Sequence, residues 1–201
     1  IIVPAYNTPP ADVARLSEAG IPTLFLTRRI PGMQGSYVGS DNMLGTRMAT
    51  EHLIEHGCTR IALIGGAKGT SSQREREDGA VSAVARTAGA VALSSHPGPT
   101  SPEAGYAMAL EVMSGRETPD AILAYNDIVG LGVHAAIVDS GRVVGRDIRL
   151  VGFDDVAFSH FLRPSVTSVD SRPSLMGSIS ADALGRLIVD PANDETVLVP
   201  N

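Results

Sequence analysis

Ala121-Ile122-Leu123-Ala124-Tyr125-Asn126-Asp127 joins four consecutive apolar residues to a polar pair, and a helical pattern then continues to Gly141. Apolar residues that do not alternate with polar ones predict a strand that is buried on both faces. Asn126 is a typical helix N-cap residue, so the segment predicts a strand that leads directly into a helix. Such a unit is the building block of a parallel sheet covered by helices.

The same arrangement recurs along the chain of 201 residues. Short apolar runs predict further strands at Ile1–Pro4, Thr23–Leu26, Ile61–Ile64 and Leu150–Phe153. Capping residues and apolar periodicity predict helices that begin at Thr8-Pro9, Asp41-Asn42, Ser71, Ser101-Pro102 and about Pro173. The stretch Ser94–Ser101, rich in Gly, Ser and Pro, is expected to be a loop. Alternating strands and helices predict an α/β fold with doubly wound parallel sheets.

Composition limits the class of protein. A hydrophobic content of 43% is enough to bury a substantial core, in one domain or in two small ones. A single cysteine, Cys58, excludes an intrachain disulfide and favours a reducing compartment, so we expect a cytoplasmic protein. No run approaches the roughly 18 apolar residues of a membrane helix. The net charge of −6 argues against nucleic-acid binding by this segment itself, and any DNA contact is expected elsewhere.

Ligands of open α/β sheets bind beyond the carboxyl ends of the strands. Polar residues follow the predicted strands at Ala5–Thr8, Gly65–Ser72, Tyr125-Asn126-Asp127 and Asp154-Asp155. These segments are therefore the predicted surroundings of a binding crevice.

Several strings, taken together with their order and spacing, resemble one known family over nearly the whole chain. The strings are Tyr37-Val38-Gly39-Ser40-Asp41-Asn42, Glu51-His52-Leu53-Ile54, Arg60-Ile61-Ala62-Leu63-Ile64-Gly65-Gly66, Ser101-Pro102-Glu103-Ala104-Gly105-Tyr106 and Val151-Gly152-Phe153-Asp154-Asp155. The chain resembles the effector-binding core of the lactose-repressor (LacI/GalR) family of transcriptional regulators.

The resemblance implies two subdomains of the periplasmic-binding-protein type I fold, with an incomplete N-terminal subdomain. By that comparison, residues 1–57 plus 170–190 form the N-terminal subdomain, and residues 58–169 plus 191–201 form the C-terminal one. The helix-turn-helix DNA-binding domain of the family is expected to be absent from this chain, as are a hinge helix and the first two βα units.

The resemblance also assigns ligand-binding roles. Asp154 would hydrogen-bond a ligand hydroxyl or ring nitrogen, Arg76 would bind the ligand through its planar guanidinium group, and Asn126 would offer a donor and an acceptor. The alternatives are a turn-forming role for Asp154, a structural salt bridge for Arg76 and a helix cap for Asn126. Asp41 and Asn42 are open between capping a helix and lining the crevice.

Geometry restricts these assignments, and two positions depart from the family pattern. Neighbouring residues at a strand end point to opposite faces, so only one of Asp154 and Asp155 is expected to face the crevice. Likewise Arg74 and Arg76, two residues apart on a helix, cannot point the same way. Thr100 stands where family members often have an aromatic ring, and Ser171 stands where they commonly have Gln.

The resemblance implies a bacterial repressor core that binds a small polar effector, a sugar or related metabolite, between two lobes and thereby controls operator DNA binding. It implies no catalysis, cofactor or metal. It also implies a homodimer with contacts from Ile128, Leu131, Phe161 and Leu162, for which burial within the monomer is the alternative.

Two other classes of protein stay open at this point. A periplasmic sugar-binding receptor shares the bilobal fold, and fold analogy alone does not separate it from a repressor. His52-Leu53-Ile54-Glu55-His56 matches the H-x-x-E-H pattern of a zinc peptidase, although no third zinc ligand is apparent. Gly65–Thr70 lacks the G-K-[ST] order of a phosphate-binding loop.

Overall fold

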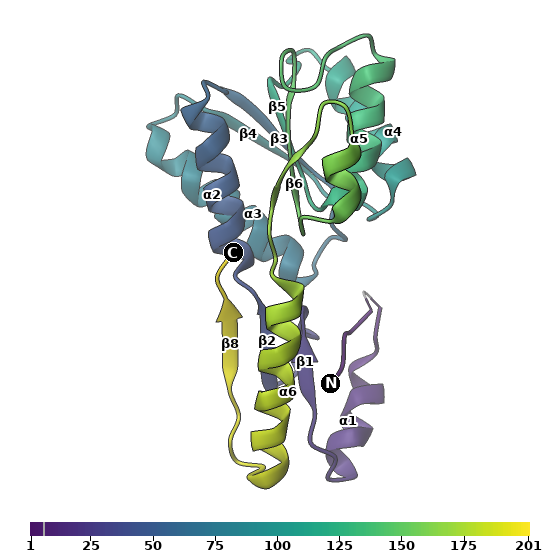
Figure 1. Cartoon of the computed structure of the whole chain (residues 1–201), viewed down its shortest axis with the longest axis vertical. Coiled ribbons are helices and arrows are strands. Elements are labelled where there is room, and N and C mark those ends of the chain that lie inside the picture. Colours follow the sequence, from purple (N-terminus) through teal and green to yellow (C-terminus); the bar gives the residue numbers. More distant parts are fainter. Residues whose placement is uncertain (6) are drawn as a thin grey trace.

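The computed structural model describes residues 1–5 and 7–201, which form two lobes stacked along the longest axis of the molecule (Figure 1). Tyr6, within the expected crevice segment Ala5–Thr8, lies outside the described residues. The chain crosses between the lobes at Asp41 and again at residues 170–172.

The larger lobe is built on a five-stranded parallel sheet. In spatial order its strands are β4 (Ala92–His96), β3 (Arg60–Ile64), β5 (Ala121–Ala124), β6 (Arg149–Phe153) and β7 (Thr167–Val169). Two short 3₁₀ helices, η1 (Ala85–Thr87) and η2 (Ala157–Phe161), lie in its connections.

Helices cover both faces of this sheet. α4 (Pro102–Ser114) and α5 (Asp127–Asp139) pack together on one face, and α2 (Asn42–Glu55) and α3 (Ser71–Val84) on the other. Side chains alternate accordingly along β3: Ala62 and Ile64 belong to the cluster with α4 and α5, and Leu63 to the cluster with α2 and α3. Double coverage explains why the central strands are continuously apolar.

The smaller lobe contains a three-stranded parallel sheet in the order β1 (Leu24–Leu26), β2 (Ser36–Ser40) and β8 (Thr196–Val199). α6 (Pro173–Val189) packs on one face through Met176 and Ala183. α1 (Pro10–Glu18) packs on the other face, where Val13 meets Phe25 and Tyr37. No helix among the described residues combines the length and the apolar character needed to span a bilayer.

This architecture confirms the predicted α/β class with helix-covered parallel sheets. The predicted subdomain boundaries are wrong at two places. Residues 191–201 were expected in the C-terminal subdomain, but β8 pairs with β2 in register Val38 to Val197, so this segment completes the smaller sheet. The boundary expected at residue 57 lies near Asp41, because α2 buries Ala49 and Leu53 against the larger sheet.

Several local predictions also need correction. The expected loop Ser94–Ser101 overlaps β4, and Ile1–Pro4 contributes only one bridge, between Ile2 and Phe25. The N-cap of α1 is Pro9, not Thr8, and it makes no side-chain capping bond. The remaining helices begin within a residue or two of the predicted positions.

Candidate ligand-binding site

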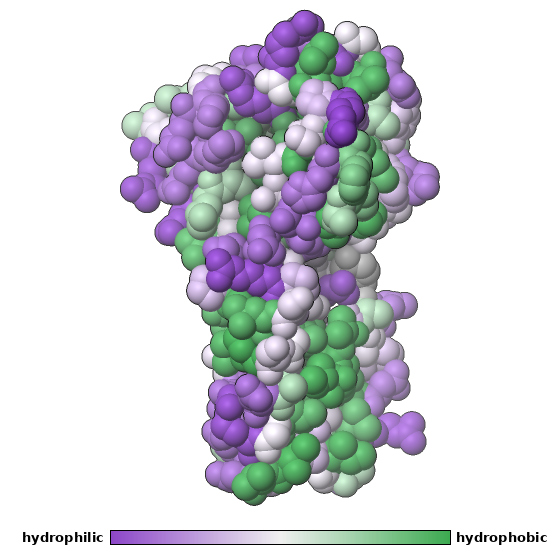
Figure 2. All heavy atoms as spheres, in the orientation of Figure 1, coloured by the Kyte–Doolittle hydropathy of each residue, from purple (hydrophilic) through white to green (hydrophobic). Residues whose placement is uncertain are grey.

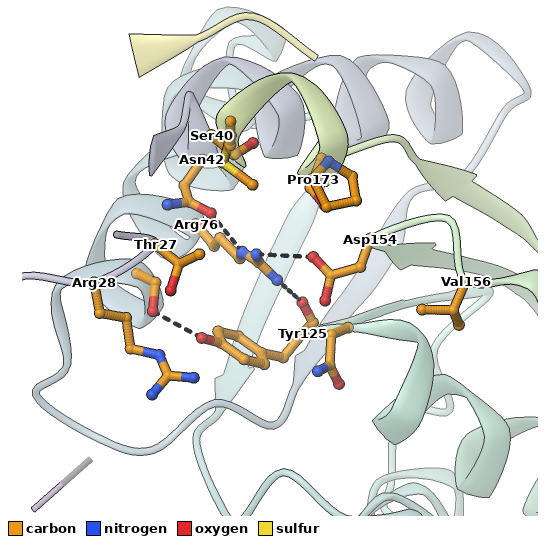
Figure 3. Close-up of a pocket in the computed structure, with 13 residues that line it drawn as sticks. Thr27, Arg28, Ser40, Asn42, Arg76, Tyr125, Asp154, Val156 and Pro173 are labelled. Atoms are coloured by element: carbon orange, nitrogen blue, oxygen red, sulfur yellow. Dashed lines mark hydrogen bonds and ion pairs between the residues drawn. The ribbon is translucent and has the colours of Figure 1, made fainter. Parts of the chain in front are cut away.

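A cavity of about 330 Å³ lies where the two lobes meet (Figure 3). The larger lobe lines it with Asn42, Ser72, Arg76, Tyr125, Asn126, Asp154 and Val156. The smaller lobe and its connection line it with Thr27, Arg28, Ser40, Ser171, Pro173 and Met176. Most of these residues follow a strand or begin a helix, which is where open α/β folds bind ligands.

Arg76 is the centre of the polar network in this cavity. Its side chain is 8% exposed and is stacked over the rings of Phe153, at 3.6 Å, and Tyr125, at 4.5 Å. Nε donates to Asn42 Oδ1 at 2.8 Å, Nη1 donates to the backbone carbonyl of Tyr125, and Nη2 lies 3.5 Å from Asp154 Oδ1. Ring contacts to its plane and polar contacts to its nitrogen atoms therefore hold the guanidinium group in one orientation.

Asp154 and Asp155 follow β6 and diverge, as the alternation along a strand requires. Asp154 lines the cavity, whereas Asp155 lies 3.2 Å from His160 Nε2 on the outside. Both residues have positive φ angles, 98° and 49°, a conformation that costs free energy for a residue with a side chain. The turn therefore needs support from its surroundings.

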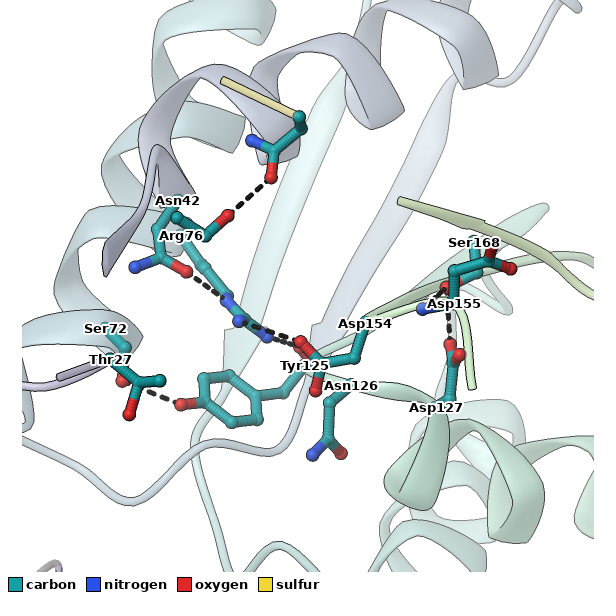
Figure 4. Close-up of polar contacts among 12 residues, drawn as sticks. Thr27, Asn42, Ser72, Arg76, Tyr125, Asn126, Asp127, Asp154, Asp155 and Ser168 are labelled. Carbon is teal, nitrogen blue, oxygen red and sulfur yellow. Dashed lines mark hydrogen bonds and ion pairs between the residues drawn. The ribbon is translucent and has the colours of Figure 1, made fainter. Parts of the chain in front are cut away.

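That support comes from the buried carboxylate of Asp127 at the start of α5 (Figure 4). Asp127 Oδ2 accepts the backbone N–H of Val156 at 2.8 Å, and Oδ1 accepts the hydroxyl of Ser168 at 2.7 Å. The Ser168 hydroxyl oxygen in turn accepts the N–H of Asp155 at 3.1 Å. Burial raises the pKa of the Asp127 carboxyl above its usual value.

Two further contacts hold neighbouring side chains in place. Asn42 Nδ2 donates to Glu75 Oε2 at 2.8 Å, and burial raises the pKa of the Glu75 carboxyl. The hydroxyl groups of Ser72 and Tyr125 are 2.8 Å apart and hydrogen-bonded. Asn42 thus connects Arg76 and Glu75 at the point where the chain enters the larger lobe.

The structure brings five of the expected ligand-binding residues to one cavity: Asn42, Arg76, Asn126, Asp154 and Ser171. Asn126 also caps α5, since its side-chain oxygen accepts the N–H of Val129 at 3.1 Å. Capping and lining are therefore compatible at this position.

The structure does not place Asp41 and Thr100 in the lining of this cavity. Asp41 Oδ1 accepts the N–H of Leu44 at 2.9 Å, so its carboxylate is used to cap α2. Thr100 is half-buried in the segment between β4 and α4. In the five-stranded sheet β4 is the strand farthest from β6 and its Asp154 turn, so the segment that follows β4 lies away from the cavity.

Sequence analysis missed several lining residues. Thr27 and Arg28 line the cavity and directly follow the predicted strand Thr23–Leu26. Because polar residues after strands are expected to line the crevice, the sequence could have predicted both. Tyr125 lay within a segment that was singled out, but it was not chosen. Ser40 ends β2, a strand that its short and partly polar sequence did not reveal.

The expected dimer-contact residues differ in exposure. Phe161 is 76% exposed and Ile128 is 36% exposed. Leu131 is half-buried, and Leu162 packs against the core of the larger lobe. The dimer surface remains a prediction.

The zinc-peptidase pattern lies elsewhere on the molecule. His52 on α2 and His56, the residue that follows this helix, are both exposed and do not line the cavity. Within residues 1–5 and 7–201, no group of three potential metal-ligating side chains is present. Chemically, the cavity offers hydroxyl groups, amides, two guanidinium groups and a carboxylate, a set that suits hydrogen bonding to a polar, hydroxyl-rich molecule.

Comparisons with known proteins give a consistent result. A family model described as a periplasmic binding protein-like domain matches residues 50–201. The transcriptional regulator CelR of Thermobifida fusca is 35% identical over 185 residues, covering 90% of this chain and 53% of CelR. The transcriptional regulator GalR of Escherichia coli K12 is 31% identical over 172 residues, covering 84% of this chain and 50% of GalR.

Among solved structures, one described as a CelR–cellobiose complex superposes with a TM-score of 0.84 at 31% identity. The match covers 92% of this chain and 58% of that one. The chain spans about half the length of the curated relatives that it matches.

Proposed function

Because the chain belongs to the LacI/GalR family of periplasmic binding protein-like domains, we propose that it is the effector-sensing core of a cytoplasmic transcriptional regulator. In this proposal a small polar effector, a sugar or a sugar derivative, binds between the lobes without being chemically changed. Its binding alters the affinity of the full-length protein for operator DNA through a DNA-binding domain that this segment does not include.

The observation that carries the proposal is that polar side chains from both lobes line one cavity. Arg76 and Asp154 belong to the larger lobe, and Arg28 and Ser40 to the smaller one. A molecule that contacts both sets binds one lobe arrangement more tightly than others and shifts the population toward it. Effector binding and lobe orientation are thereby linked, with a coupling of roughly 1–3 kcal/mol on the usual scale.

The relatives support a regulator over a transport receptor, because CelR and GalR are both named as regulators of transcription. The CelR structure described as a cellobiose complex supports a sugar as the class of effector. The dimer expected at Ile128, Leu131, Phe161 and Leu162 would place two DNA-binding domains at a fixed spacing.

Thermal unfolding in the presence of a panel of sugars tests the binding site. A ligand at 100 times its dissociation constant stabilises the folded protein by about 2.7 kcal/mol. We expect Asp154→Asn and Arg76→Met to abolish the shift produced by any hit. Arg74→Met is the matched control, because Arg74 is exposed on the same helix and does not line the cavity. A hit whose shift survives in both cavity variants would reject the assignment.

Operator binding tests the regulatory part. Operator sequences can be selected from random DNA with the full-length protein. Its affinity for these sequences is expected to change about 5- to 150-fold when the effector is added. An effector that binds but leaves DNA affinity unchanged would reject regulation and leave the binding site intact.

A further inference from the structure

The first turns of α3 carry both a contact between the lobes and a residue of the cavity. Ser71 begins this helix of the larger lobe, and its hydroxyl oxygen accepts the backbone N–H of Arg29, in the smaller lobe, at 3.3 Å. Glu75 lies four residues further along and therefore on the same face of the helix as Ser71. Arg76, the next residue, lines the cavity.

Arg29 is held in the smaller lobe by two strands of its sheet. Its guanidinium carbon lies 4.3 Å from the centre of the Tyr37 ring in β2, and its Nη2 donates to the hydroxyl of Thr196 in β8 at 3.1 Å. We therefore expect Arg29 to move with the smaller sheet whenever the lobes change their relative position.

Glu75 is a half-buried carboxylate that interacts with a cation of each lobe. Burial raises the pKa of its carboxyl, whereas the hydrogen bond from Asn42 and the charges of Arg29 and Arg76 lower that pKa. A partly buried carboxylate depends on such partners to stay ionised and in place. The position of Arg29 therefore affects how firmly Glu75 is held.

Asn42 links the carboxylate of Glu75 to the guanidinium group of Arg76 (Figure 4). Its Nδ2 donates to Glu75 Oε2 at 2.8 Å, and its Oδ1 accepts Arg76 Nε–H at 2.8 Å. A side-chain amide has donors on its nitrogen and an acceptor on its oxygen, so the bond to Glu75 decides which of the two faces Arg76. Asn42 is only 3% exposed, and a reversed amide would leave the Arg76 Nε–H without this acceptor.

We propose, on the basis of the proposed function, that Glu75 is a positioning residue that orients Arg76 for the effector through Asn42. Glu75 itself does not line the cavity. Its interaction with Arg29 makes the orientation of Arg76 depend on the arrangement of the two lobes. Effector affinity is thereby linked to lobe arrangement even for an effector that contacts the larger lobe alone.

Hydrogen exchange of the Arg76 Nε–H tests this positioning without any effector. The signal is observed by NMR of the full chain with nitrogen-15-labelled arginine and is assigned by its absence in Arg76→Lys. Glu75→Leu removes the acceptor of the Asn42 amide and should speed the exchange about tenfold to a hundredfold, the scale of a hydrogen bond to a charged group. Asp78→Leu is the matched control, because it removes an exposed carboxylate of the same helix that does not line the cavity.

Titration calorimetry of the full chain with cellobiose, glucose, galactose and ribose tests the effect on binding. For each sugar that binds, Glu75→Leu should weaken affinity about three- to tenfold, because Arg76 loses an orienting hydrogen bond. Arg29→Gln should weaken it about two- to fivefold, the scale of a partly exposed charge interaction. Arg15→Gln, at an exposed cation of α1 in the same lobe, should leave affinity unchanged.

A double-mutant cycle tests the dependence on the smaller lobe. Glu75→Gln keeps an acceptor for Asn42 and removes the charge that interacts with Arg29. If Arg29 acts through Glu75, then Arg29→Gln should have little further effect on the exchange rate or on affinity when Glu75→Gln is already present. Equal effects of Arg29→Gln in the two backgrounds would overturn the link between the lobes. The cycle needs no Glu75→Leu protein, so it decides the question even if that variant does not fold.

The outcomes distinguish this inference from the proposed function. An Arg76 exchange rate that is the same in the parent protein and in both Glu75 variants would overturn the positioning role and leave a sugar-sensing core. Absence of binding by all four sugars, together with faster exchange in Glu75→Leu, would overturn the sugar effector and support the positioning of Arg76.

Discussion

The two lobes differ in the size of their hydrophobic cores. In the larger lobe, each face of the sheet has its own large cluster of buried side chains beneath a pair of helices. The clusters of the smaller lobe are both much smaller, and each is covered by a single helix. We therefore expect the larger lobe to hold Arg76 and Asp154 more rigidly than the smaller lobe holds Arg28 and Ser40.

The surface shows the same contrast. Apolar side chains gather over the smaller lobe, and polar ones gather where the lobes meet (Figure 2). Leu175, Ile188, Val189 and Leu198, on α6 and β8, are all at least 42% exposed. Because its buried clusters are also smaller, we expect the smaller lobe to unfold locally before the larger one.

Shortening one core side chain in each lobe should give the largest effects. Ile122 in β5 and Leu24 in β1 are both 0% exposed. Ile122→Ala should lower the free energy of unfolding by about 2–5 kcal/mol, because it leaves a cavity in a tightly packed core. Leu24→Ala should cost about 2–3 kcal/mol, since a small cluster can collapse around the gap more easily. Urea unfolding followed by circular dichroism measures both.

Hydrogen exchange of the backbone amides then shows which strands each substitution destabilises. Leu24→Ala should speed exchange in β1, β2 and β8 and spare β3 and β5. Ile188→Ala, at a side chain that is 61% exposed, should stay within about 0.5 kcal/mol of the parent protein. If Leu24→Ala speeds exchange equally in both sheets, the lobes unfold as one unit and the contrast between them is lost.

The sequence predicted the larger lobe better than the smaller one for a physical reason. β3, β5 and β6 have neighbours on both sides and helices on both faces, so their residues are continuously apolar. The edge strands β4 and β7 are partly exposed, and Ser94, Ser95 and His96 in β4 resemble a loop. The pairing of β8 with β2 joins segments about 160 residues apart, which no local pattern reveals.

The candidate site was predictable where a residue both follows a predicted strand and matches a familiar string. Asp154 meets both conditions, and Asn126 follows a predicted strand and received its role from the family resemblance. Arg28 follows a predicted strand without such a string, and it was missed. Which loops of one lobe face the other depends on how the chain crosses at Asp41 and at residues 170–172, and this is a property of tertiary packing.

Asp127→Asn should have the next largest effect on stability. It tests how the larger lobe holds the turn that carries Asp154. An amide in place of the carboxylate can accept only one of the two bonds from Val156 and Ser168. With the amide oxygen toward Val156, the NH₂ group would face the Ser168 oxygen, and the hydrogen bond that the Ser168 hydroxyl donates to a buried carboxylate would be lost, which costs about 1–3 kcal/mol. We expect weaker effector binding as well, because the Asp154 turn loses an anchor. Urea unfolding and calorimetry measure the two effects.

Asp155→Asn is the matched control for this variant. Asp155 belongs to the same turn, but its side chain is exposed and pairs with His160, so the substitution should change stability by less than about 0.5 kcal/mol. Equal losses of effector affinity in the two variants would mean that Asp127 has no special part in positioning the turn.

Tyr37→Phe should have the smallest effect on stability at neutral pH. The pH dependence of that effect tests the smaller lobe specifically. Tyr37 is 1% exposed in the smaller lobe, and its hydroxyl donates to the carbonyl of Thr27 at 3.3 Å. Loss of this bond should cost about 0.5–1.5 kcal/mol. Burial, followed by the charge of Glu75, raises the pKa of the Tyr37 phenol to about 12.

Because the folded-state pKa of Tyr37 lies above the value of 10.0 expected for the unfolded chain, the neutral phenol contributes stability in full below pH 10. That contribution is lost as the pH rises from 10 to about 12. The parent protein should therefore lose more stability than Tyr37→Phe over this interval, and the gap between their unfolding curves should narrow or reverse. Curves that stay parallel would contradict the raised pKa. Because Thr27 precedes Arg28, ionisation of Tyr37 should loosen the cavity wall of the smaller lobe, and effector affinity should fall over the same pH interval in the parent protein but not in Tyr37→Phe.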